Sequence, residues 1–237
     1  VIWYTSQFYA QSFLLTKCSL DYEQANSIIL IALVVATPFF IIFGALSDKW
    51  GRKNIMLAGM LLGVLLYRPI FQQLYTLSDT TQTTVVNESI ERSLSPGNAA
   101  AATRSVVQLL DNGNQVKTTT NLNNPAAAPV KQVVVNDSTK WKMIGLVTVM
   151  VLFVTMVYGP IAAFLVELFP TRIRYTSMSL PYHIGNGVFG GLVPFIATLI
   201  TTIPGTNHLS GLWYPIGVAA LSFIIGILYL SNRKTAA

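Results

Sequence analysis

The chain has 237 residues, of which 52% are hydrophobic and only 10% charged, and its formal net charge is +6. A soluble domain has about 25% charged residues, so this composition excludes an ordinary soluble domain and favours a membrane protein. Basic residues stand in small groups between apolar runs, which argues against a nucleic-acid-binding face. One cysteine excludes an intramolecular disulfide, and two histidines are too few for a histidine-rich metal site, so we expect no metal and no cofactor.

Long apolar runs predict membrane-spanning helices, because a helix needs ~20 apolar residues to cross the hydrocarbon core. In lipid a helix satisfies its own backbone hydrogen bonds. We therefore expect an all-α membrane protein with six transmembrane helices. These helices are predicted at about residues 1–16, 24–46, 54–75, 141–167, 175–202 and 210–231.

The short loops predict an orientation. Three groups of basic residues fall on one side of the membrane if six helices alternate. They are Lys49, Arg52 and Lys53, then Arg172 and Arg174, then Arg233 and Lys234. Basic short loops remain in the cytoplasm, so both ends of the chain are expected to be cytoplasmic.

Residues 76–139 differ from the rest of the chain. They are rich in Thr, Asn, Ser and Gln, and they separate the helices of residues 1–75 from those of residues 140–237. On the six-helix topology this insert lies outside the cytoplasm. We expect a mostly irregular loop, in which residues 99–110 can form a short helix and residues 130–135 a strand.

The sequence Gly44-Ala-Leu-Ser-Asp48-Lys-Trp-Gly51-Arg52-Lys53 joins the second and third predicted helices. Gly44 is expected to allow close helix packing and Gly51 a tight turn. Asp48 is expected to face the positive N-terminal dipole of a neighbouring helix. Arg52 is expected to pair with an acid at the same interface. The alternative is an ordinary basic loop that only sets the orientation.

A second charged group begins at Glu167, near the end of the fourth predicted helix, and continues with Arg172 and Arg174. We expect it to form a charge network with the loop around Asp48. Such a network would hold a cytoplasmic gate shut in one state and release it in the other. The alternative is two separate groups of interfacial charges.

Several polar side chains lie within the predicted spans, where polar groups are costly and often functional. The candidates for a central cavity are Tyr4, Gln7, Tyr158, Tyr182, His183 and Asn186. His183 can carry a proton near neutral pH; the alternative is a buried histidine bonded to a neighbouring helix. Arg68 is expected to reach the membrane interface rather than to bind an anionic substrate.

Two glycine pairs have the spacing of small residues that pack membrane helices. Gly59 and Gly63 form one G-x-x-x-G pair, and Gly187 and Gly191 form another. Both pairs are predicted to let the backbones of neighbouring helices approach.

The motif G-x-x-S-D-x-x-G-R-K resembles the cytoplasmic loop signature of major facilitator superfamily transporters. The segment from Glu167 to Gly187 resembles the junction of helices ten and eleven in the metabolite:proton symporter branch, which includes shikimate, 2-oxoglutarate and proline or betaine carriers. Trp3-Tyr-Thr-Ser-Gln7-Phe-Tyr9 resembles helix seven of that branch. The resemblance implies that the six helices are helices seven to twelve, the C-terminal bundle of a twelve-helix fold whose N-terminal half is missing.

This resemblance implies proton-coupled symport of a small organic acid or osmolyte across the bacterial inner membrane, by alternating access. The implied partners are the small-molecule substrate, protons, the lipid bilayer and the N-terminal six-helix half, and no nucleic acid. No spacing of Ser, His and acid suggests nucleophilic catalysis, so an enzyme is not expected. The alternative is a non-transporting membrane receptor or structural protein that binds through a periplasmic loop at residues 76–139.

Overall fold

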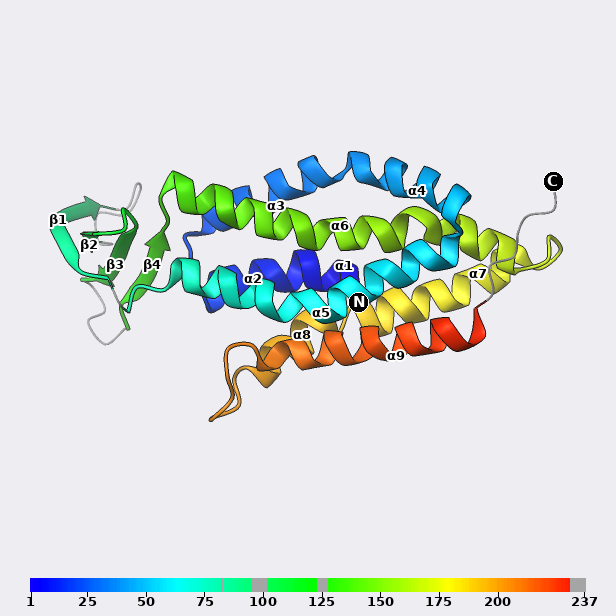
Figure 1. Cartoon of the computed structure of the whole chain (residues 1–237). Coiled ribbons are helices and arrows are strands. Elements are labelled where there is room, and N and C mark those ends of the chain that lie inside the picture. The colour runs from blue at the N-terminus through cyan, green and yellow to red at the C-terminus, as the bar shows by residue number, and fades with distance from the viewer. Residues whose placement is uncertain (82, 95–101, 123–127, 231–237) are drawn as a thin grey trace.

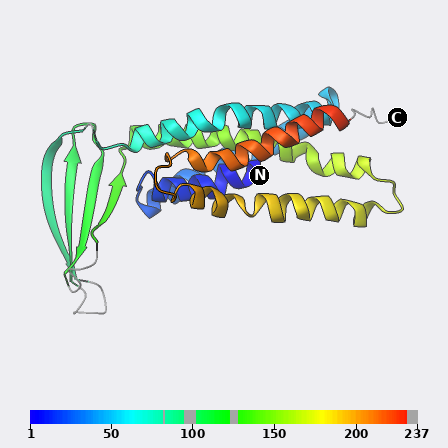
Figure 2. The same cartoon turned by 90° about the horizontal axis from the view of Figure 1, so that it is seen from below.

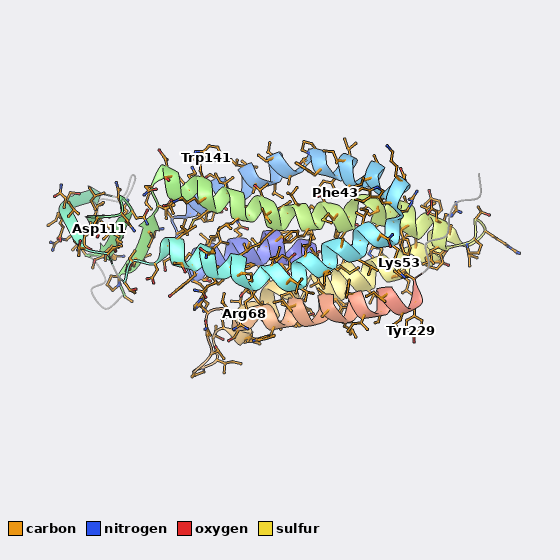
Figure 3. The ribbon with its side chains drawn as sticks, viewed as in Figure 1. Phe43, Lys53, Arg68, Asp111, Trp141 and Tyr229 are labelled. Carbon is orange, nitrogen blue, oxygen red and sulfur yellow. The ribbon has the colours of Figure 1, made fainter. Side chains whose placement is uncertain are left out.

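The computed structural model describes residues 1–81, 83–94, 102–122 and 128–230. The protein is an elongated bundle of helices with a β-sheet at one end (Figure 1). We call this end the sheet end, and the opposite end, where Lys53 and Tyr229 lie, the basic end (Figure 3).

The N-terminal half of the chain forms three helical rods. The first contains a π-helical segment, the second is interrupted at Pro38, where proline removes a helix hydrogen bond, and the third is continuous. Gly51 alone connects the second to the third, with a φ of +89° that suits only glycine. The rods are α1 (Ile2–Tyr4), η1 (Thr5–Tyr9) and α2 (Ala10–Thr16); α3 (Tyr22–Ala36) and α4 (Pro38–Trp50); and α5 (Arg52–Ser78).

The C-terminal half forms three more rods, of which the middle one contains a second π-helical segment. The elements are α6 (Asp137–Leu168); α7 (Arg174–His183), η2 (Ile184–Gly190) and α8 (Val193–Ile200); and η3 (Ser210–Leu212) with α9 (Trp213–Tyr229). Helix α6 packs against α3, α4 and α5, and α9 packs against α5, so α5 and α6 form the centre of the bundle (Figures 1 and 2).

Five helices in the described residues are long and apolar enough to cross a membrane: Tyr22–Trp50, Arg52–Ser78, Asp137–Leu168, Arg174–Ile200 and Ser210–Tyr229. The first predicted span is also helical, but it extends only from Ile2 to Thr16, which is shorter than this length. The protein is therefore a mostly helical membrane protein, and the count of six spans stays a prediction.

A buried polar cluster joins three of the rods. The Tyr67 hydroxyl lies 2.9 Å from Ser6 Oγ and 3.1 Å from the carbonyl oxygen of Ile2. Ser6 Oγ donates to the carbonyl oxygen of Met150 at 3.1 Å. Because polar groups inside a membrane bundle need partners within the protein, this cluster fixes η1 against α5 and α6.

Glycines bring the central helices together. A Cβ at Gly59 would lie 2.8 Å from Met156 Cβ and 3.0 Å from the carbonyl oxygen of Phe153, so this glycine packs α5 onto α6 as predicted. For Gly187 and Gly191 the described residues show no such close approach to a neighbouring helix. A Cβ at Gly187 would have nothing within 4 Å, and one at Gly191 would meet the Gly187 carbonyl oxygen within the same rod at 2.4 Å.

Helices α4 and α6 cross at a second close contact. A Cβ at Gly159 would lie 3.0 Å from the carbonyl oxygen of Phe40 and 3.2 Å from the backbone nitrogen of Gly44, whereas a Cβ at Gly44 would lie 3.9 Å from the Gly159 carbonyl oxygen. The close packing expected of Gly44 therefore depends on Gly159, which offers no space for a side chain.

Four strands follow α5: β1 (Val85–Leu94), β2 (Ala102–Leu110), β3 (Gln115–Asn121) and β4 (Val130–Val134). They form an antiparallel sheet in the order β1-β2-β3-β4. The expectation of a mostly irregular loop is therefore wrong. The short helix expected at residues 99–110 is wrong for 102–110, which form β2; residues 99–101 lie outside the described residues. Strand pairing on both sides of β2, between β-branched residues such as Val106, Thr118 and Ile90, outweighs the local helix propensity of alanine.

The sheet is attached to the helices through β4. The backbone of Val133 donates to the Ser19 carbonyl oxygen at 2.7 Å and accepts from the Asp21 nitrogen at 2.9 Å. Gln24 on α3 donates from Nε2 to the Val135 carbonyl oxygen at 2.7 Å and accepts from the Val135 nitrogen at 2.9 Å. Strand β4 therefore lies against the bundle, and β1 is the strand farthest from the helices (Figure 2).

Candidate functional site

An arginine at the basic end bridges two helical rods. Arg52 Nη2 lies 3.2 Å from Asp48 Oδ1 and 2.8 Å from Glu167 Oε1. The side chain of Arg52 is 20% exposed, Glu167 30% and Asp48 63%. Since a solvated i, i+4 pair contributes little, the shorter, more buried contact with Glu167 is the stronger one.

The contact with Glu167 joins the start of α5 to the end of α6. The network expected between the Asp48 loop and Glu167 is therefore present in the geometry, and the alternative of two separate charge groups does not describe it. Arg52 Nη1 is buried and has no hydrogen-bond partner among the described residues. The guanidinium thus has a free donor for a second acceptor at this interface.

Asp48 makes a different contact from the expected one. Its carboxylate accepts from Arg52, one turn along the chain, and within the described part of the chain no helix N-terminus takes Asp48 as a side-chain cap. The expectation that Asp48 faces the dipole of a neighbouring helix stays a prediction. Asp48 lies near the end of α4 and Arg52 begins α5, so the turn at Gly51 brings the two side chains together.

Lys53 holds the end of α9. Its Nζ donates to the carbonyl oxygens of Ile227 at 3.0 Å and Leu230 at 2.5 Å. These carbonyls belong to the last turn of a helix, where backbone acceptors have no partner within the helix and a cation is favourable. The pattern of the loop sequence contains no signal for this partner, which lies about 175 residues away along the chain.

The other two predicted gating residues lie outside the Arg52 network. Arg172 is exposed. Arg174 donates from Nε to the carbonyl oxygen of Phe169 at 3.3 Å, which caps the last turn of α6. Among the described residues both ion pairs use Arg52, so these two arginines do not extend the network.

Tyr158 lies at the centre of the predicted cavity residues. Its hydroxyl donates to Asn186 Oδ1, and its ring lies 5.3 Å from that of Trp3. Tyr4 on α1 and Tyr182 on α7 come from elements that pack against α6, which carries Tyr158. The structure thus brings α1, α6, α7 and η2 together at one polar and aromatic cluster, which we call the Tyr158 cluster (Trp3, Tyr4, Tyr158, Tyr182 and Asn186).

Both π-helical segments border this cluster. A Cβ at Gly190, the last residue of η2, would lie 2.7 Å from Cδ2 of Tyr4, the residue before η1. Gln7 lies within η1, and its Oε1 is buried without a hydrogen-bond partner among the described residues. Isolated π-helical turns occur frequently at functional sites, and an unpaired acceptor beside the cluster is available to a bound solute.

A groove of about 400 Å³ lies between α6 and α7. Two of the predicted cavity residues line it. The lining residues are Ala162, Leu165, Tyr175, Met178, Ser179, Tyr182 and His183. His183 is exposed among the described residues, and its role, as a proton carrier or as a histidine bonded to a neighbouring helix, stays a prediction. Within the described residues no group of three His, Cys, Asp or Glu side chains could hold a metal ion.

The chain is similar to parts of several transport proteins. The chain is 40% identical over 81 residues to a putative metabolite transport protein of Haemophilus influenzae, covering 33% of this chain and 17% of that protein. It is 30% identical over 82 residues to the citrate-proton symporter of Klebsiella pneumoniae, covering 35% and 18%. It is 22% identical over 231 residues to the alpha-ketoglutarate permease of Escherichia coli, covering 98% and 39%.

No known family profile matches the chain, and no solved structure matches it. The chain spans at most about two fifths of the length of these relatives. The curated homologues are metabolite, citrate and alpha-ketoglutarate transporters of the major facilitator type, and this chain, a mostly helical membrane protein, is similar to a part of them.

Proposed function

We propose that the chain is the C-terminal six-helix half of a proton-coupled symporter for a small organic acid or osmolyte. The observation that carries this proposal is the Tyr158 cluster, a polar and aromatic site inside a bundle of spanning helices and beside two π-helical segments. Substrate sites of secondary transporters lie near the middle of the membrane, at the interface of two repeats and at irregular helices. The relatives' names, which include a citrate-proton symporter, support the substrate class.

In this proposal the basic end is cytoplasmic and the sheet is periplasmic, in a bacterial inner membrane. The N-terminal half completes the cavity by covering α1, α7 and η2, where Tyr182, Ile184, Val188 and Phe189 are 44–51% exposed. Rocking of the two halves then opens the cavity to one side at a time. Tyr4, Gln7, Tyr182, His183 and Asn186 bind the solute around Tyr158, and His183 is the candidate proton carrier.

The charge network has a bracing role in the same cycle. Arg52 ties the cytoplasmic ends of α5 and α6 through Glu167, and Lys53 ties α9 to them. These contacts make the basic end one rigid unit in one state. Breaking the Arg52–Glu167 pair releases α6, the helix that carries Tyr158, and so couples the gate to the cavity.

Uptake into proteoliposomes under an imposed pH gradient tests the proposal. The full-length protein is expected to accumulate citrate or 2-oxoglutarate when the outside is acidic, and to accumulate less when the gradient is collapsed by a protonophore. If accumulation does not depend on the pH gradient, the proposed proton coupling is wrong. In the same assay Tyr158→Phe, which keeps the ring on Trp3 but loses the donor to Asn186, should raise the concentration for half-maximal uptake by on the order of ten-fold.

The sheet favours a second candidate, a receptor that binds a ligand through residues 76–139. The described residues of this segment form a β-sheet at one end of the helical bundle (Figure 1). A receptor of this kind would lose its function if β1 and β2 were removed, whereas a carrier would keep moving solute.

A further inference from the structure

A second site, unrelated to the Tyr158 cluster, lies on the outer surface of α5 and α9. The guanidinium carbon of Arg68 lies 5.1 Å from the centroid of the Trp213 ring (Figure 3 labels Arg68). Arg68 is exposed and Trp213 is 61% exposed. Cations stack on the faces of tryptophan rings, and this contact leaves the in-plane N–H groups of the guanidinium free.

The position of Arg68 along α5 places it at a membrane boundary. At a rise of ~1.5 Å per residue, Arg68 lies ~24 Å from Arg52 at the basic end and ~15 Å from Ser78. The hydrocarbon core is ~30 Å thick, so Arg68 is within reach of the headgroups on the sheet side. Trp213 is the first residue of α9, and tryptophans mark this interface.

The neighbouring cationic groups are already engaged or neutral. Lys17 donates to the carbonyl oxygen of Thr201 at 3.2 Å. His208 stacks on Tyr75 at 4.0 Å; partial burial first, and the charge of Lys17 second, lower the pKa of His208 from 6.5, so it is neutral at pH 7. In the described part of the chain Arg68 itself has neither an ion pair nor a hydrogen bond. Arg68 is thus a cation that has no acceptor among the described residues.

An exposed apolar strip, formed by Leu61, Leu65, Gly217 and Leu221, continues from Arg68 toward the middle of the membrane. On α5, Leu61 and Leu65 are exposed at 39% and 60% and share one face with Arg68, at i−7 and i−3. On α9, one turn beyond Trp213, Gly217 is exposed and a Cβ there would have nothing within 4 Å. Leu221, which follows on the same face, is 59% exposed.

We propose that Arg68, Trp213 and this apolar strip bind an anionic phospholipid of the leaflet on the sheet side. The guanidinium donates to the phosphodiester oxygens, for which its planar fork of N–H groups is well suited. An acyl chain lies along Leu65 and Leu221 in the space that Gly217 leaves open. Basic side chains between membrane helices recognise lipid headgroups in this way, and this site does not depend on what the protein transports.

Native mass spectrometry of the purified full-length protein, titrated with phosphatidylglycerol, tests the headgroup contact. Arg68→Gln should retain one phosphatidylglycerol fewer and bind it on the order of ten-fold more weakly. Trp213→Leu, which keeps the charge but loses the ring, should weaken binding less. Arg172→Gln is the matched control, because Arg172 is also exposed, and it should bind as the unaltered protein does. Equal binding by Arg68→Gln and Arg172→Gln would overturn the proposal.

Gly217→Leu separates a lipid from a soluble phosphate. Leucine fills the open space at Gly217 and leaves Arg68 and Trp213 in place, so phosphatidylglycerol binding should fall several-fold. Soluble glycerol phosphate at millimolar concentration should fail to displace the lipid from the unaltered protein. If glycerol phosphate displaces it, and Gly217→Leu binds normally, the site is one for a soluble anion and the lipid proposal is wrong.

Discussion

Replacing Arg52 by glutamine should lower transport on the order of ten-fold while the protein still inserts into the membrane. Arg52 Nη2 lies 2.8 Å from Glu167 Oε1, and a hydrogen bond to a charged partner contributes about 1.5–3 kcal/mol, or roughly ten-fold or more in the balance of two states. Glutamine keeps a donor but loses the charge. Initial uptake rate, divided by the amount of correctly inserted protein, is the measurement.

Further variants identify which contact of Arg52 matters. Glu167→Gln should reduce transport more than Asp48→Asn, because Asp48 is 63% exposed and Glu167 only 30%. The double variant Arg52→Gln/Glu167→Gln should transport no worse than either single variant, since both remove the same pair. Arg172→Gln, which removes an exposed charge outside the pair, is the control. A larger effect of Asp48→Asn than of Glu167→Gln would contradict the bracing role.

Gly159→Ala should destabilise the helix bundle, by about 1–3 kcal/mol, the usual range for forcing a methyl group into a packed site. Its Cβ would lie 3.0 Å from the Phe40 carbonyl oxygen and 3.2 Å from the Gly44 nitrogen. Both are backbone atoms, so no side-chain rotation can relieve the overlap. The expected result is a clearly lower midpoint of thermal unfolding for the detergent-purified protein.

Two other glycine substitutions serve as controls for Gly159→Ala. A Cβ at Gly44, on the facing helix, has its nearest neighbour at 3.9 Å, and one at Gly145, on α6 itself, has none within 4 Å. Gly44→Ala and Gly145→Ala should therefore leave the midpoint unchanged or raise it, because alanine favours a helix over glycine. Equal losses at Gly145 and Gly159 would show that the α4–α6 crossing is not the cause.

The sequence predicted the membrane class and the helical fold because both depend on local properties. Runs of apolar residues are long enough to span, and the described residues contain five such helices. The pairing of Arg52 with an acid was also accessible, because a charge at a membrane interface needs a partner. Contacts between residues far apart in the sequence could not be predicted, as the capping of α9 by Lys53 shows.

The strand predicted at residues 130–135 is confirmed by β4 (Val130–Val134). The other three strands were missed because they gain their stability from pairing. Residues 115–121, Gln-Val-Lys-Thr-Thr-Thr-Asn, have little hydrophobic alternation, yet β3 pairs with both β2 and β4. Gln24 and Val135, 111 residues apart, hold β4 on the bundle. Strand propensity depends on such neighbours, and no local pattern reveals them. The π-helical segments beside Tyr4 and Asn186 likewise depend on packing between rods.

Solute counterflow by the purified full-length protein tests most directly whether the helices form a carrier. It is measured with and without the outer hairpin, which consists of β1 and β2. The Asp111 nitrogen donates to the Thr84 carbonyl oxygen at 3.0 Å, so residues 85–110 can be replaced by a short Gly-Ser linker at adjoining ends. We predict that proteoliposomes preloaded with unlabelled citrate or 2-oxoglutarate transiently accumulate the labelled solute, with both proteins. A protein that inserts correctly but shows no accumulation with its hairpin intact, or loses it completely with the hairpin removed, would contradict the account.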